Sequence, residues 1–146
     1  MQILIKKLSL YQCTYEIIRK DGSTETMTLD AKTFLLHDVT HFVVEQALDL
    51  RKGFWGLLAA GHKLEELYGK DNVLTGELRD IERLVGPVQF VYSNHIAPQD
   101  FADYTQHLDM AFSAEQLGQA LTEIGTIMQR WQALETGDQL TLQWKE

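Results

Sequence analysis

Residues 14–29 read TYEIIRKDGSTETMTL, and this stretch decides the fold. Strand-forming residues flank Asp21-Gly22, a dipeptide that is typical of the tight turn in a β-hairpin. A two-residue turn at this dipeptide would scatter the apolar side chains over both faces of the hairpin. The alternative is a three-residue loop, 20–22, in which Gly22 takes the left-handed conformation that glycine adopts without strain.

The longer loop gives the hairpin one apolar face. It pairs Tyr15 with Met27. It also pairs Cys13 with Leu29, and it places Ile17 on the same side. Because a sheet that packs against a core needs one buried face, the apolar pattern selects this register. The sequence therefore predicts an antiparallel hairpin with a three-residue loop.

The rest of the chain supplies two more strands and a run of helices. Residues 2–10 (QILIKKLSL) and 139–144 (QLTLQW) have strand-like patterns. The expected helices lie between them, at residues 34–50, 54–69, 75–86, 98–108 and 114–135, with 89–93 as a short strand or an extended segment. We expect one α+β domain, 1–146, in which an antiparallel sheet from the N-terminal hairpin strands and the C-terminal strand packs against four to five helices.

Local signals predict where three of these helices begin or end. Gly53 follows two cations, which is typical of a helix C-terminus. Gly86-Pro87 is expected to end the third helix, because proline lacks the N–H that a helix interior needs. Ser113, with Gln116 three residues later, forms a capping box for the last helix.

Composition excludes several classes of protein. The chain has 146 residues, of which 45% are hydrophobic, so it can bury a core and is not expected to be disordered. Its net charge of −8 disfavours binding to nucleic acid or to an anionic membrane. The single cysteine, Cys13, is typical of the reducing cytoplasm. Lys6 and Lys7 interrupt the apolar N-terminal segment, so we expect neither a signal peptide nor a membrane span.

The helix at 34–50 is mostly apolar but carries four polar residues: His37, Asp38, His41 and Glu45. At about 100° per residue, these four fall within roughly a quarter of the helix circumference, and apolar residues cover most of the rest. A surface helix has the opposite balance. We therefore expect this helix to be buried on most sides, with its polar edge facing a cleft, a ligand or a network of partners.

One interpretation of this edge is a metal or acid–base site. His37 and His41 have the i, i+4 spacing by which two imidazoles on one helix bind one ion. A third ligand would come from elsewhere in the fold. Asp38 or Glu45 would orient an imidazole or act as the catalytic general base. The cofactor would be zinc or a similar divalent metal, and the activity metal-dependent hydrolysis.

The other interpretation is a structural hydrogen-bond network in a non-enzymatic domain that binds a partner or a small ligand. In that case Asp38 pairs with His41, and His41 or a backbone donor satisfies Glu45. The exposed sheet edges, with Trp144 near the end of the chain, would suit a homodimer. The sequence leaves both interpretations, and the question of catalysis, open.

Two further residues are candidates for lining a ligand site. Trp55 lies in RKGFWGLLAAG, a stretch whose glycines match no phosphate-binding loop and for which close helix packing is the main interpretation. His62 would lie level with His41 if the first two helices formed an antiparallel pair, although its own helical face is polar. The charged stretch GELRDIERL (76–84) is expected to be a solvated helix face.

The stretch from His37 to Gly61, HDVTHFVVEQALDLRKGFWGLLAAG, resembles a group of small bacterial proteins that share HDxxHFxVE followed by a Gly-aromatic-Gly segment. The resemblance implies that this stretch works as one unit, and it brings no known reaction. HDVTH is also similar to the metal-binding helix of cyclic-nucleotide phosphodiesterases, which would make His37 and Asp38 metal ligands. Val43 departs from that pattern, and Asp38 departs from the HExxH helix of zinc proteases.

Overall fold

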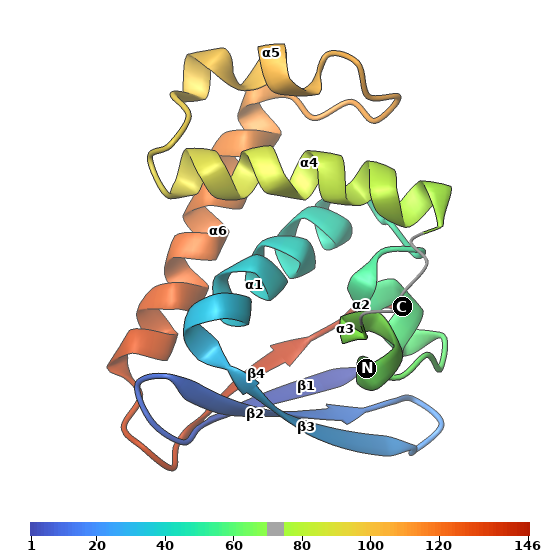
Figure 1. The fold of residues 1–146 in the computed structure, drawn as a ribbon, viewed down its shortest axis with the longest axis vertical. Coiled ribbons are helices and arrows are strands. Elements are labelled where there is room, and N and C mark those ends of the chain that lie inside the picture. The colour runs from blue at the N-terminus through green and yellow to red at the C-terminus, as the bar shows by residue number, and fades with distance from the viewer. Residues whose placement is uncertain (70–74) are drawn as a thin grey trace.

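The computed structural model describes residues 1–69 and 75–146. A four-stranded antiparallel sheet forms one layer, and helices pack against one of its faces (Figure 1). The strands are β1 (Gln2–Lys7), β2 (Gln12–Ile18), β3 (Thr24–Asp30) and β4 (Gln139–Gln143). The helices of the described residues are α1 (Ala31–Ala47), α2 (Phe54–Ala59), α3 (Leu64–Tyr68), α4 (Gly76–Tyr92), the short 3₁₀ helix η1 (Pro98–Asp100), α5 (Phe101–Thr105) and α6 (Ala114–Ala133). The α+β class and the composition of the sheet are confirmed.

The hairpin register is also confirmed. Tyr15 pairs with Met27 and Cys13 with Leu29, as the apolar face required. Gly22 has a φ of +84°, so the loop between β2 and β3 contains the left-handed glycine that the three-residue loop needs. The strand order is β3-β2-β1-β4, so the C-terminal strand adds to the free edge of β1.

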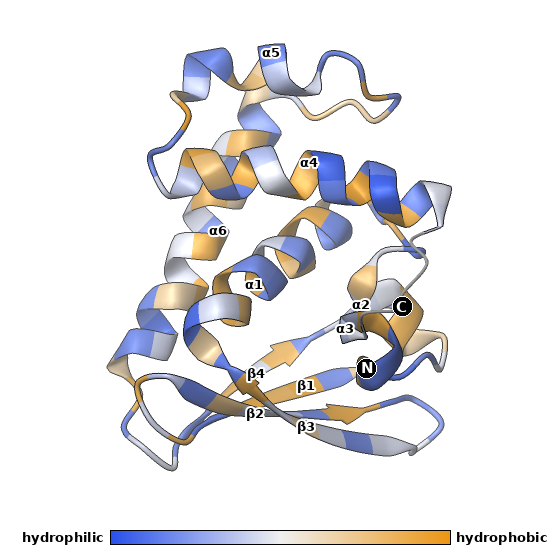
Figure 2. Cartoon of the chain, viewed as in Figure 1, coloured by the Kyte–Doolittle hydropathy of each residue, from blue (hydrophilic) through white to orange (hydrophobic). Residues whose placement is uncertain are grey.

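The sheet buries one face and leaves the other polar. Alternate residues of β1, β2 and β4 are almost wholly buried, while β3 forms a partly exposed edge. Both hydrophobic and hydrophilic residues occur along the strands (Figure 2). The buried apolar side chains of the sheet are Ile3, Ile5, Cys13, Tyr15, Ile17, Leu140 and Leu142. Helix α1 packs against this apolar face of the sheet.

Helix α1 is buried over most of its length. It starts directly after β3, where the Asp30 carboxylate accepts a hydrogen bond from the Thr33 N–H and caps the helix. The sheet, α4 and α6 surround it (Figure 1). The burial expected from its inverted polarity is therefore present.

The end of α1 differs from the prediction. The helix stops at Ala47, and the left-handed residue that follows it is Asp49, with a φ of +54°. Gly53 instead has an extended backbone and precedes α2. The two cations before Gly53 resembled a helix C-terminus, but this glycine is needed for a tertiary contact described below.

The single helix predicted for 54–69 is two short helices, α2 and α3. They are separated by a turn in which Gly61 has a φ of +105°, a conformation that continues no helix. The buried Arg19 side chain holds this turn, because its guanidinium donates to the carbonyl oxygens of Leu58 and His62. A side chain from the sheet thus fixes a turn that no local signal marked clearly.

Helix α4 is longer than predicted. It runs through Pro87 to Tyr92, so residues 89–93 are mostly helical rather than a strand or an extended segment. A proline inside a helix costs about 3 kcal/mol. Val85, Val88 and Val91 bury one face of the helix across this point, and that burial offsets the cost. The capping box at the start of α6 is present as predicted.

Candidate metal centre

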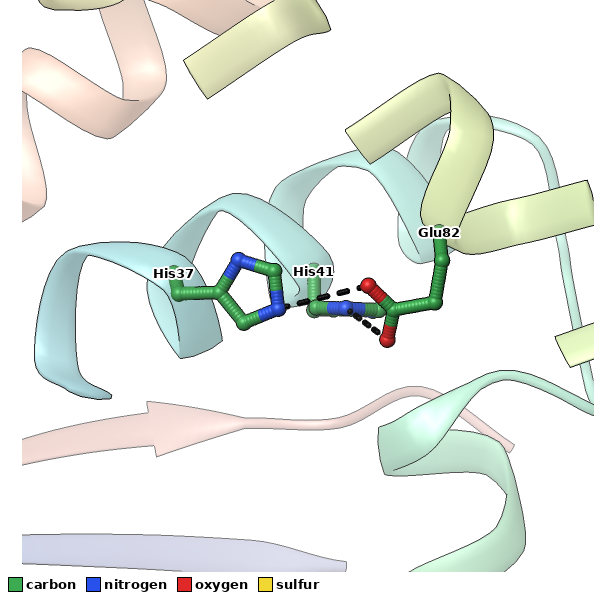
Figure 3. A group of neighbouring side chains, drawn as sticks. All are labelled: His37, His41 and Glu82. Atoms are coloured by element: carbon green, nitrogen blue, oxygen red, sulfur yellow. Dashed lines mark ion pairs between the residues drawn. The ribbon is translucent and has the colours of Figure 1, made fainter. Parts of the chain in front are cut away.

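The polar residues of α1 divide into two groups with different surroundings. The imidazoles of His37 and His41 lie beside each other, with ring centroids 4.7 Å apart, and both face a carboxylate on α4 (Figure 3). Asp38 instead contacts tyrosines from β2 and α3. The four residues therefore do not form one site.

The carboxylate that faces the imidazoles belongs to Glu82. Its Oε1 lies 2.9 Å from His41 Nε2, and its Oε2 lies 3.4 Å from His37 Nε2. One donor atom from each of the three residues lies within 4.8 Å of the others. Bonds of about 2.0 Å in a tetrahedral zinc site separate neighbouring ligand atoms by roughly 3.3 Å, which is close to the two nitrogen–oxygen distances.

The outer nitrogen of each imidazole is held by a separate partner. His41 Nδ1 lies 2.8 Å from Glu45 Oε1, and His37 Nδ1 lies 2.9 Å from Gln89 Oε1. Both oxygens accept hydrogen bonds, so both Nδ1 atoms are donors. When the imidazoles are neutral, this leaves the lone pairs on the Nε2 atoms, which point towards Glu82. Metal-binding histidines are usually held in this way.

Glu45 also connects α1 to α2. Its carboxylate accepts hydrogen bonds from the backbone N–H groups of Phe54 (2.7 Å), Trp55 (3.0 Å) and Gly56 (3.3 Å). These are N–H groups of the first turn of α2, which has no side-chain cap of its own. With His41 added, the buried Glu45 carboxylate is satisfied by four donors.

Two glycines allow close approach of the chain at this point. A Cβ atom on Gly53 would overlap the Glu45 carboxylate, and one on Gly56 would overlap the carbonyl group of Arg51. Gly53 therefore lets the chain approach Glu45 closely, and Gly56 lets the first turn of α2 pack against the backbone of Arg51.

Asp38 belongs to a buried network on the sheet side of α1. Its Oδ2 accepts hydrogen bonds from the hydroxyls of Tyr15 (2.8 Å) and Tyr68 (2.6 Å). Burial raises the pKa of the Asp38 carboxyl to about 6, although the two tyrosine hydrogen bonds act in the opposite direction. The predicted pairing of Asp38 with His41 is therefore wrong, because the tyrosines occupy the carboxylate.

The electrostatics of the group favour a positive charge between Glu45 and Glu82. Burial lowers the pKa of His41, but the hydrogen bonds with these two carboxylates outweigh it and raise the pKa to about 9. Burial also raises the pKa of Glu82, but the hydrogen bonds from His37 and His41 lower it well below its usual range. In the metal-free protein a proton on His41 supplies that charge, and a metal ion would replace it.

The group is partly exposed. His41 is 1% exposed, whereas the side chains of His37 and Glu82 are 36% and 33% exposed. Asp38 and Glu45 are buried, and all the contacts described above hold them in place. This burial argues against the general-base role predicted for them, and Glu45 is placed instead to orient His41.

The two predicted lining residues lie elsewhere. Trp55 is fully buried, its indole N–H donates to the backbone carbonyl of Asp38, and its ring stacks on Tyr15, so it is a core residue. His62 is exposed on the turn before α3, where it pairs with Glu66 at 3.3 Å. Residues 54–69 do not form the single helix that would have carried His62, which lies between α2 and α3.

Glu82 is the residue that the sequence-based prediction missed, since the 76–84 stretch was interpreted as a solvated face. A signal was present. Glu82 follows Leu78 by four residues and precedes Val85 by three, so it lies on the edge of the apolar stripe of α4. Gln89, seven residues after Glu82, lies on the same edge.

Comparison with known proteins adds no relative. No protein-family model matches the chain, and no curated protein or solved structure is detectably similar to it. Within the described residues, no helix combines the length and the apolar character needed to cross a membrane. The resemblance of the 37–61 stretch to small bacterial proteins stays a prediction, and the function is argued from the geometry of the site.

Proposed function

We propose that this protein binds a divalent metal ion, with zinc as the best fit, through His37, His41 and Glu82. One observation carries the proposal: both Nε2 atoms point at the same carboxylate while Glu45 and Gln89 hold both Nδ1 atoms. An oriented pair of imidazoles with one carboxylate is a common ligand set for zinc.

The partial exposure of two of the three side chains supports a catalytic rather than a purely structural metal. Structural zinc sites use four protein ligands, whereas catalytic sites use three and leave a position for water or substrate. Here three protein ligands converge, and two of them are partly exposed. A metal at such a position lowers the pKa of a coordinated water molecule, which is the basis of hydrolysis near neutral pH. We therefore propose a metal-dependent hydrolase.

A second candidate is a structural ion-pair network without metal. It is favoured by the complete hydrogen bonding of the group: Glu45 has four donors, and a protonated His41 donates to both Glu45 and Glu82. Trp144 is buried against Phe42, so its side chain is not available for the dimer contact expected of it, and self-association stays a prediction.

Zinc titration by calorimetry, with elemental analysis of untagged protein, separates the two candidates. We expect one zinc per chain, with binding lost in His37→Ala and in Glu82→Ala. These residues are partly exposed, so both variants are expected to fold. The matched control is His62→Ala, which removes an exposed histidine from another i, i+4 pair with a glutamate and should bind zinc normally.

The structural network predicts a different result. Zinc would not bind stoichiometrically, and chelators would leave the thermal unfolding temperature unchanged. The hydrolase proposal is tested separately, by assaying metal-loaded protein against ester, amide and phosphoester substrates. Hydrolysis that persists in Glu82→Ala or after chelation would contradict it.

A further inference from the structure

A series of aromatic rings continues from the two imidazoles. The His41 ring lies 6.0 Å from the Phe54 ring, centroid to centroid, and Phe54 lies 5.2 Å from Tyr68. Tyr68 in turn lies 5.2 Å from Phe34 in an edge-to-face contact. The rings therefore form a continuous apolar wall that begins at a proposed metal ligand.

The open part of this wall is next to the open part of the metal group. Phe34 and His37 are three residues apart on α1, and side chains at that spacing are neighbours on a helix surface. Both are only half-buried, as is Tyr68, whereas Phe54 and His41 are buried. A molecule that approaches the metal from the His37 side would therefore meet the rings of Phe34 and Tyr68.

The Tyr68 ring is fixed before any ligand arrives. Its hydroxyl donates to Asp38 at 2.6 Å, and its ring packs between Phe34 and Phe54. A side chain that is already ordered loses little conformational entropy when a ligand packs against it, so it contributes to affinity more than a mobile one does. Ring-on-ring contact also favours an aromatic ligand over an aliphatic one of similar size.

Building on the proposed metal site, we infer that its ligand is a small molecule in which an oxygen-donor group, bound to the metal, is joined to an aromatic ring that packs against Phe34 and Tyr68. This names the substrate class that the proposed hydrolase would accept. The two parts of the molecule are recognised by different residues, so each part can be tested alone.

Cobalt(II) in place of zinc gives a visible spectrum that reports ligand binding at the metal. We propose to titrate the cobalt-loaded protein with acetohydroxamate and with benzohydroxamate, which share a metal-binding group and differ in the ring. We expect benzohydroxamate to bind about tenfold more tightly, from burial of its ring. The ratio of the two dissociation constants is the measured quantity.

Variants test whether the aromatic wall causes the preference for benzohydroxamate. Phe34→Ala should bring the ratio close to one while leaving acetohydroxamate binding and the cobalt spectrum unchanged. Phe34→Leu, which keeps most of the apolar volume, should reduce the ratio less. The matched control is Phe90→Ala, since Phe90 is a 50% exposed aromatic residue whose ring contact is with His95. It should retain the full ratio.

The outcomes separate this inference from the proposed function. The inference is overturned if the cobalt-loaded protein binds the two hydroxamates with equal affinity, or if Phe34→Ala keeps the preference for benzohydroxamate. Either result leaves the proposed metal site intact. Failure of cobalt to bind the unaltered protein overturns the proposed function and this inference together.

Discussion

The Glu45 carboxylate occupies the space in which a side chain on Gly53 would begin. The two residues lie on opposite sides of the connection between α1 and α2. Their contact lets one buried carboxylate both orient His41 and bind the first backbone N–H groups of α2. The packing of α2 and the geometry of the proposed metal ligand therefore depend on the same contact.

Gly53→Ala is expected to destabilise the protein by about 1–3 kcal/mol, because the added methyl group must displace the Glu45 carboxylate in a packed interior. Urea unfolding measures the change. The control is Gly118→Ala in the second turn of α6, where the added methyl group meets no atom within 4 Å and should stabilise the protein by about 0.5–1 kcal/mol. Equal effects of the two substitutions would show that Gly53 is not constrained.

Tyr15→Phe and Tyr68→Phe should each cost about 1.5–3 kcal/mol of stability, because each removes a hydrogen bond to the buried Asp38 carboxylate. The ring packing is retained in both. Tyr104→Phe, at a half-exposed tyrosine on α5, should change the free energy of unfolding by less than about 0.5 kcal/mol. A neutral result at both Tyr15 and Tyr68 would contradict the proposed role of the network.

Lys7→Ala is expected to cost about 1–2 kcal/mol, because the buried ammonium group donates to the carbonyl oxygens of Trp131 (3.2 Å) and Leu134 (2.8 Å) at the end of α6. Lys6→Ala provides the comparison, since its side chain is exposed on the other face of β1. Chemical denaturation of the two variants measures the difference in their free energies of unfolding. This difference should vanish if the end of α6 is not stabilised by a cation.

Cys13 should resist alkylation in the folded protein. Burial raises the pKa of its thiol to about 12, so at pH 8 the folded protein holds the neutral thiol, which is a poor nucleophile. We expect mass spectrometry after iodoacetamide treatment to find Cys13 unmodified in buffer and fully modified in urea. Rapid modification without urea would mean that the β2–β3 face opens readily.

Sequence patterns predicted the elements whose signals are local. The hairpin register followed from one apolar face, because only this pairing places Met27 and Leu29 on the same face as Tyr15 and Cys13. The last helix followed from Ser113 and Gln116, which lie three residues apart and contact each other directly. In both cases the interacting groups are close in the sequence.

The rest could not be predicted because the deciding contacts are between distant residues. The sequence predicted Gly53 as a helix C-terminus, but a glycine is required there because the Glu45 carboxylate fills the space of a side chain. Pro87 looked like a helix stop as well, but the core holds the helix together across it. Glu82 completes the candidate site from a different helix, and its polar neighbours on α4 concealed the apolar edge on which it lies.

The central place of β1 in the sheet sets an order for folding. Its pairing with β2 joins segments that are close along the chain, whereas its pairing with β4 joins segments from opposite ends. Closing so large a loop is entropically costly and slow. The three N-terminal strands can therefore associate early, but the apolar face of the sheet that packs against α1 is completed only when β4 docks. Mutations that weaken β4 docking should therefore slow the formation of the proposed metal site, although β4 contributes no ligand to it.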